Sequence, residues 1–230
     1  MKDKIKVAIL DDHPTIVDGY VYRLSSFPEI EVVSTLSFGG DLERTLADRP
    51  TDVLLLDVNV PTAPDNPNPY PILHAIPSLL QAHQRLSILV ISMYAERGLI
   101  RAVMEAGASG YILKDDQTAA RDLGNIILSV AGGGIYFSQK AHQLYMRHLS
   151  AETGFLSSRQ LEALSLSAAY PDSTTADLAE KMRVSNSTVR NLLSGAYMKL
   201  EVHNRSAAIA RARQLGLISS EAPTIPTFKK

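Results

Sequence analysis

Four apolar runs in the first half of the sequence each end in side chains that can do chemistry. In chain order these side chains are Asp11 and Asp12, Asp57, Ser92 and Lys114. Three carboxylates that are brought together repel one another, so either one is protonated or a cation lies between them. A small set of oxygen ligands suits magnesium, which also binds phosphate oxygens. A carboxylate held beside magnesium and a lysine can attack a phosphoryl group and form an acyl phosphate.

Asp57 is the candidate nucleophile of this set. It lies in the stretch Thr51–Pro61, where five apolar residues fall within six positions, the pattern of a strand buried on both faces of a sheet. Taken alone, a carboxylate at the end of such a strand is also often a helix cap or a loop residue. Magnesium and Lys114 would neutralise charge on the transferred group, and Ser92 could donate a hydrogen bond to its oxygens.

These side chains can meet only if the strands that carry them are neighbours. Five strands are expected, at 5–10, at 30–35, in the stretch from Thr51, at 88–91 and at 111–113. Helical patterns occur at 15–26, at 39–48, from near Pro71, at 95–106 and at 117–131. Strands that alternate with helices make a parallel sheet covered on both faces. The sequence therefore predicts an α/β fold: a doubly wound, five-stranded parallel sheet in the flavodoxin-like order 2-1-3-4-5. Ligands of such a sheet bind outside the carboxyl ends of the first and third strands.

The composition is that of a globular protein with two modest domains. The chain has 230 residues, 45% hydrophobic and 20% charged, and no cysteine, which excludes disulfides and thiolate metal sites. The first apolar run, about six residues long, is too short for a signal-peptide core or a membrane span, so we expect a cytoplasmic protein without membrane contact. Residues 1–131 carry 11 basic and 17 acidic side chains (net -6), whereas residues 154–218 carry 8 basic and 5 acidic (net +3). This asymmetry is a weak sign of nucleic-acid contact in the C-terminal part.

The second half of the sequence changes from mixed to all-helical patterns. Glycines at 132–134 end the fifth helical pattern, and the range 132–153 has the composition of a linker. After Leu156 we expect one helix to about Ala168, a short helix through Lys181 and a longer helix capped by Ser185. Two helices joined by a few residues, the second with a polar N-terminal half, form a helix-turn-helix, whose second helix enters the DNA major groove. A small helical bundle with a solvated polar face fits the same pattern.

A helix-turn-helix reading assigns DNA contacts by side-chain type. Arg190 could reach guanine or a phosphate, and Asn186 and Asn191 could reach adenine or phosphates, whereas the basic residues outside the helix's first half would meet phosphates. The predicted DNA-binding residues are Lys181, Arg183, Ser185, Asn186, Ser187, Thr188, Arg190, Asn191, Ser194, Lys199 and Arg205.

The first half resembles the receiver domain of two-component response regulators. The resemblance covers about residues 4–131 and rests on Asp11-Asp12-His13-Pro14, Leu-Leu-Leu-Asp57, Ile-Ser92 and Ala-Gly-Ala-Ser-Gly-Tyr111-Ile-Leu-Lys114. It implies that Asp57 accepts phosphate from a sensor histidine kinase and that Asp11, Asp12 and Asp57 hold Mg²⁺ with the backbone carbonyl of Asn59. It also implies that Ser92 and Tyr111 are a switch pair. The other interpretation of Tyr111, a half-buried strand tyrosine, is compatible with that role.

Leu156 to Ile218 resembles the LuxR-type DNA-binding domain of the NarL/FixJ subfamily. The matching pieces are Leu156-Ser-Ser-Arg-Gln, Leu178-Ala-Glu-Lys-Met, Ser-Thr-Val189-Arg190, Lys199-Leu200, Asn204-Arg205 and Ala-Arg-Gln-Leu-Gly-Leu-Ile. Leu192 stands where the family often has histidine, so the family's base contacts do not transfer directly to this position.

One region departs from the receiver pattern, which usually has Met-Pro-Gly after the phosphoacceptor strand. Here five prolines fall within Pro61–Pro71, too many for the interior of a helix. We expect an extended loop that overhangs the phosphorylation site, followed by a helix with a second break at Pro77. His74 and His83, which flank that helix, are interpreted as surface residues.

Together the two resemblances imply a DNA-binding transcriptional response regulator and not an enzyme. The expected organisation is a receiver at 1–131, a linker at 132–153, a LuxR-type domain at 154–218 and a disordered tail at 219–230. Phosphorylation of Asp57 is expected to favour a homodimer that binds double-stranded DNA. Two alternatives remain: a receiver-like regulator that works without phosphate, and an aspartate-based phosphatase, for which Asn59 lacks the proton that a general acid must donate.

Overall fold

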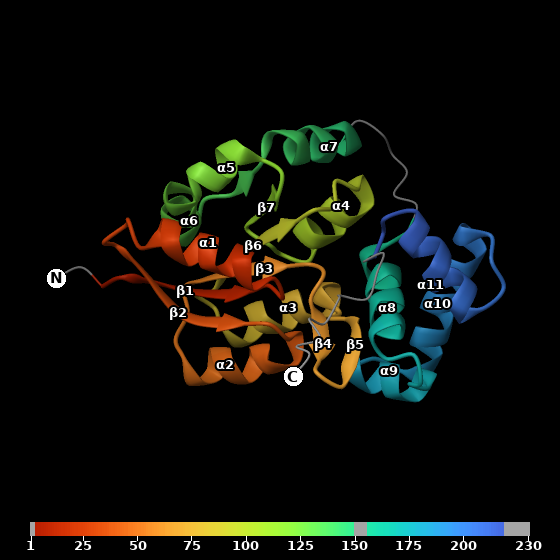
Figure 1. The fold of residues 1–230 in the computed structure, drawn as a ribbon. Helices are drawn as coiled ribbons and strands as arrows, with labels where there is room; N and C mark the ends of the chain where they lie inside the picture. The colour runs from red at the N-terminus through yellow and green to blue at the C-terminus, as the bar shows by residue number, and fades with distance from the viewer. Residues whose placement is uncertain (1–2, 150–155, 219–230) are drawn as a thin grey trace, which may run out of the picture.

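The first half of the chain forms a parallel sheet with helices on both faces (Figure 1). The structure is a computed structural model that describes residues 3–149 and 156–218. The strands, in sheet order, are β2 (Ile30–Leu36), β1 (Ile5–Leu10), β3 (Val53–Asp57), β6 (Ser87–Ser92), β7 (Gly110–Leu113) and β8 (Tyr136–Phe137). The predicted order of five strands is confirmed, and β8 adds a sixth strand at the β7 edge.

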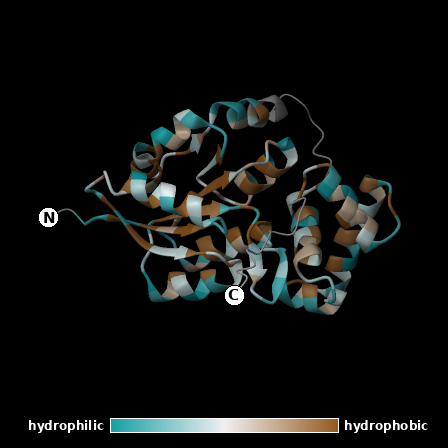
Figure 2. Cartoon of the chain, viewed as in Figure 1, coloured by the Kyte–Doolittle hydropathy of each residue, from teal (hydrophilic) through white to brown (hydrophobic). Residues whose placement is uncertain are grey.

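Alternate residues of each strand pack into two apolar layers, because successive side chains of a strand point to opposite faces. Leu54 and Leu56 of β3 lie in one layer, and Val53 and Leu55 lie in the other. The first layer packs on α2 (Leu42–Asp48), which follows the short η1 (Gly39–Asp41), and on α3 (Ile72–Ala82) and α4 (Arg97–Glu105). The second layer packs on α1 (Pro14–Leu24), α5 (Gln117–Arg121) and α6 (Leu123–Ala131). Figure 2 shows the apolar strands at the centre of this sandwich.

Two predicted helices differ from the structure. The pattern at 117–131 forms two helices, because Asp122 leaves the helical region (φ -95°, ψ 12°) between α5 and α6. The break expected at Pro77 is absent, since α3 runs through it. Ile76 and Leu79 are fully buried beside Pro77, and this packing outweighs the one backbone hydrogen bond that the proline removes.

Part of the range predicted as a linker is attached to the sheet. Tyr136 of β8 pairs with Gly110 of β7, and the N–H of Leu113 donates to the hydroxyl of Ser138 at 3.1 Å. Helix α7 (Gln139–Leu149) packs against α4 and buries Ala141 completely. Residues 150–155 and the predicted tail at 219–230 lie outside the described residues.

The proline-rich stretch folds into a two-stranded hairpin, β4 (Pro61–Ala63) and β5 (Asn66–Pro69). Its extended backbone was predicted, whereas its antiparallel pairing and its packing against η1 and α8 were not. Proline lacks the N–H that a central strand must donate, so it is tolerated in edge strands. Both strands of a two-stranded hairpin are edge strands, and the prolines of β4 and β5 therefore fit there. The hydroxyl of Thr62 donates to the carbonyl of Asn68 at 2.8 Å and ties the two strands together.

The C-terminal domain consists of four helices, which are α8 (Ser158–Ala169), α9 (Thr175–Lys181), α10 (Asn186–Leu200) and α11 (Arg205–Gln214). The cap predicted at Ser185 is confirmed, since its hydroxyl accepts from the N–H of Thr188, and Ser157 and Thr174 form capping boxes at the starts of α8 and α9. Arg183, with φ of 52°, makes the tight turn between α9 and α10. No helix in the described ranges is long and apolar enough to cross a membrane.

Candidate functional site

The predicted chemical side chains meet at the carboxyl edge of the sheet. The register pairs Leu10 with Leu56 and Ser92 with Leu113, so the strands that carry the site end at the same level. The ammonium of Lys114 lies 2.7 Å from Asp11 Oδ2 and 2.8 Å from Asp57 Oδ2. Carboxylate oxygens of Asp11, Asp12 and Asp57 lie within 4.8 Å of one another, together with a ring nitrogen of His13.

Burial and mutual repulsion set the charge state of this cluster. The Asp57 side chain is only 4% exposed, and burial, strengthened by the nearby Asp11 carboxylate, raises its pKa even though Lys114 opposes the change. Burial likewise raises the pKa of Asp12. Burial alone would lower the pKa of Lys114, but Asp57 and Asp11 outweigh it and raise that pKa. The ammonium group of Lys114 is therefore the cation that holds together this cluster of acids, whose net charge is negative.

The cluster has unsatisfied oxygens that a metal ion could bind. Within the described residues, Asp12 Oδ1 is buried without a hydrogen bond, and the ring nitrogen Nδ1 of His13 lies 2.9 Å from it. Asn59 Oδ1 is also buried and has no hydrogen-bond partner among the residues that the structure describes, whereas the receiver resemblance implied only the backbone carbonyl of Asn59. An all-oxygen set of this kind fits a hard divalent cation such as magnesium. The sequence motif Asp-Asp-His contained His13, but a single histidine carried no signal for the site.

Ser92 and Tyr111 are connected through the backbone of Tyr94. The Tyr111 hydroxyl donates to the Tyr94 carbonyl at 2.8 Å, and the Tyr94 N–H donates to Ser92 Oγ at 3.0 Å. The alternative interpretation of Tyr111 was a half-buried strand tyrosine, but both Tyr111 and Ser92 are fully buried, and Tyr111 packs in the apolar layer that α4 covers. The two side chains are thus linked to the segment that leads into α4.

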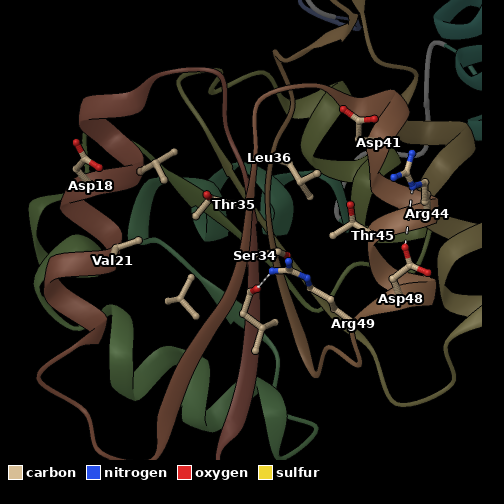
Figure 3. Close-up of a pocket in the computed structure, with 13 residues that line it drawn as sticks. Asp18, Val21, Ser34, Thr35, Leu36, Asp41, Arg44, Thr45, Asp48 and Arg49 are labelled. Atoms are coloured by element: carbon tan, nitrogen blue, oxygen red, sulfur yellow. Dashed lines mark hydrogen bonds and ion pairs between the residues drawn. The ribbon is translucent and has the colours of Figure 1, made fainter.

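A separate surface hollow of about 740 Å³ lies between α1, β2 and α2 (Figure 3). None of the predicted site residues lines it. The guanidinium of Arg49 donates to the Val33 carbonyl on the open side of β2, where the pairing with β1 shifts register. A bulge and a covering arginine are common protections of an edge strand, and we assign the hollow no chemistry.

The predicted DNA-binding residues lie on the surface of α9, the turn and α10, apart from Arg205, which is the first residue of α11. All are exposed except Arg205, which is half-buried and donates to the Ser173 carbonyl. Two lysines also contact their own domain: Lys181 lies 4.3 Å from the Tyr170 ring centre, and Lys199 donates to Gln160 at 3.2 Å. The apolar face of α10 is buried against α8, α9 and α11, so its polar face is presented to solvent.

Known proteins match both halves of the chain. The family described as response regulator receiver domain matches residues 7–123, and the family described as bacterial regulatory proteins, luxR family, matches residues 155–212. The transcriptional regulatory protein DegU of Brevibacillus brevis is 28% identical over 94% of this chain and 96% of its own length. DesR of Bacillus subtilis is 29% identical over 92% of this chain and 98% of its own.

Solved structures of RcsB from Salmonella have the same fold. One, from a study of conformational dynamism for DNA interaction, is 26% identical with a TM-score of 0.62 and covers 93% of this chain and 98% of its own. Another, bound to promoter rprA in the presence of the phosphomimetic BeF3-, is 24% identical with a TM-score of 0.64 and covers 91% and 98% of the two chains. The chain therefore belongs to the response regulators, as a transcriptional regulator with an N-terminal receiver domain and a C-terminal LuxR-type DNA-binding domain.

Proposed function

We propose that this regulator is phosphorylated on Asp57 by a sensor histidine kinase and that phosphorylation controls its binding to double-stranded DNA. The observation that carries the proposal is the position of Lys114, which bridges Asp11 and Asp57 at the carboxyl edge of the sheet. A buried acid that closes a strand beside one lysine and two further acids has the groups that phosphoryl transfer requires. The proposal includes a cytoplasmic location, because the regulator would encounter both the sensor histidine kinase and the DNA there.

The transfer step uses the groups of this cluster. A carboxylate oxygen of Asp57 attacks the phosphorus of the kinase's phosphohistidine and forms a P–O bond, while the P–N bond breaks. The electron pair of the broken bond stays on the histidine nitrogen, which takes up a proton. Lys114 is close enough to Asp57 to pair with the transferred oxygens, and Ser92 would donate to them. Mg²⁺, held by Asp11, Asp12, Asp57 and the backbone carbonyl of Asn59, would supply the remaining positive charge.

Phosphorylation would act on a two-state equilibrium. Tyr111 and Ser92 share the Tyr94 backbone, so a change in the hydrogen bonds of Ser92 reaches the entrance of α4. We propose that the phosphorylated form dimerises and places two α10 helices about 34 Å apart, one turn of DNA.

A small phosphodonor tests the proposal without knowledge of the kinase. Incubation with acetyl phosphate and Mg²⁺ is expected to move the protein from monomer toward dimer in light scattering and to tighten its binding to operator DNA selected from a random library. An EDTA arm should abolish both changes. A molar mass and a DNA affinity that stay the same, despite bound phosphate on the protein, would favour the regulator that works without phosphate.

The DNA-binding role of α10 gives a separate prediction. Arg190→Ala should weaken DNA binding by about 10-fold or more, because a bidentate arginine contact is worth about 1–3 kcal/mol. Arg211→Ala removes the same charge from an exposed position on α11 and is the matched control. The measurement is a fluorescence-anisotropy titration at fixed salt. Equal losses in both variants would mean that only net charge matters and would contradict a specific role for Arg190.

A further inference from the structure

The hairpin β4–β5 begins directly after the phosphoacceptor strand. Three residues separate Asp57 from Pro61, and the side chains of two of them, Val58 and Val60, are buried. The N–H of Asn59 donates to Asp57 Oδ1 at 3.3 Å, and the N–H of Tyr70 donates to the Val60 carbonyl at 2.8 Å. A change in the Asp57 carboxylate therefore acts directly on the residues that position the hairpin.

The hairpin is held closely against the receiver by two glycines of η1. A Cβ on Gly39 would lie 2.0 Å from the ring of Tyr70, and a Cβ on Gly40 would lie 2.8 Å from the Thr62 carbonyl. Both distances are shorter than atoms tolerate, so any other residue at these positions would push the hairpin away. Because of this close packing, the hairpin is expected to move as a rigid unit.

The far end of the hairpin caps a helix of the DNA-binding domain. Asn66 Nδ2 donates to the carbonyl of Ala169 at 3.2 Å, and Ala169 is the last residue of α8. The final carbonyls of a helix have no partner within the helix and must find one elsewhere. Here the partner comes from the receiver, 103 residues earlier in the chain.

A second polar contact joins α3 to α8. His74 Nδ1 lies 2.8 Å from Glu162 Oε1, and Arg159 donates to Glu162 Oε2 at 2.7 Å. His74, interpreted as a surface residue, is only 23% exposed, because α8 covers it. Burial would raise the pKa of Glu162, but hydrogen bonds from His74 and Arg159 outweigh it and lower that pKa.

Apolar packing completes the docking. A cavity of only about 20 Å³ remains between the domains, lined by Val58, Tyr70 and Leu73 on the receiver side and by Ala168 and Ile218 on the other. The polar face of α10 remains exposed in this arrangement. Docking thus determines the orientation of the DNA-binding domain and leaves its predicted DNA contacts uncovered.

We propose that the β4–β5 hairpin is the coupling element between the two domains. With Asp57 unmodified, it holds α8 against the receiver. Conversion of Asp57 to the acyl phosphate changes the charge and hydrogen bonding of the carboxylate that Asn59 contacts, which shifts the hairpin, releases Asn66 from Ala169 and lets the DNA-binding domain reorient. This inference rests on the proposed phosphorylation of Asp57.

The test measures the distance between the domains. The chain has no cysteine, so Gln84→Cys and His203→Cys, at two exposed positions in different domains, accept one spin label each. Pulsed EPR distances are recorded with and without acetyl phosphate and Mg²⁺. Asn66→Asp keeps the Oδ1 acceptor that Asn68 uses but loses the donor to Ala169 and faces the negative end of α8. Asp65→Ala, at the exposed hairpin turn, is the matched control.

We expect the wild type and the Asp65→Ala variant to show one distance that changes with the phosphodonor. Asn66→Asp should show the changed distance without the donor while it incorporates phosphate as the wild type does. A wild-type distance and a wild-type response in Asn66→Asp would overturn the coupling role and leave phosphorylation of Asp57 intact. A wild type that takes up no phosphate would overturn both. Asn66→Ala, which adds no charge, decides the question if Asn66→Asp fails to fold.

Discussion

Asp57→Asn is expected to abolish incorporation of phosphate from a radiolabelled phosphodonor. The amide that replaces the carboxylate is not a nucleophile toward phosphorus, whereas every other group of the cluster stays in place. The variant should fold, because one of three repelling acids is removed from a site with excess negative charge. The measurement is the amount of label that stays on the intact protein after gel filtration. Loss of this label in acid and in base identifies it as an acyl phosphate.

The control for this experiment is Asp48→Asn, an exposed acid on α2. It should incorporate label at the wild-type rate. Label on the Asp57→Asn protein equal to that on the wild type would reject Asp57 as the acceptor. Phosphate released repeatedly by the wild type from a phosphate ester, beyond one equivalent per protein, would instead revive the phosphatase interpretation.

Lys114→Met is expected to lower the free energy of unfolding of the receiver by about 3–5 kcal/mol in the absence of divalent cations, because it leaves buried carboxylates without their cation. The side chain of Lys114 is 7% exposed and bonds to Asp11 and Asp57 at once, so solvent does not replace it. The midpoint of urea unfolding, followed by circular dichroism, measures the loss.

Lys4→Met, at an exposed position before β1, removes the same charge and should change stability by less than about 0.5 kcal/mol. The double variant with Lys114→Met and Asp57→Asn should recover part of the loss, since the acid left unpaired is then gone. If Lys114→Met were as stable as Lys4→Met, the lysine would not hold the acidic cluster together.

The outline of the receiver was predictable because it depends on local pattern. Each strand that carries a site residue is a short apolar run, and parallel strands bring their carboxyl ends to one edge. For that reason the sequence alone places Asp11, Asp12, Asp57 and Lys114 together. The cap at Ser185 was predictable for the same reason, since a cap is set by residues within one turn.

Features that depend on distant partners could not be predicted. The proline-rich stretch was expected to be extended, but its pairing and its direction depend on Gly39, Gly40 and the end of α8. Similarly, α3 passes through Pro77 because of its buried neighbours, and β8 joins the sheet because β7 has a free edge.

The sequence by itself determined the order of the five strands β2, β1, β3, β6 and β7, the chemical groups of the receiver site and the helix-turn-helix. These follow from periodicity and from residue types that act within a few positions. Only the tertiary structure decided which faces of the two domains meet, because the contacts of Asn66 with Ala169 and of His74 with Glu162 join residues about 100 positions apart. No local pattern encodes such a pairing, since its energy comes from burying two surfaces together.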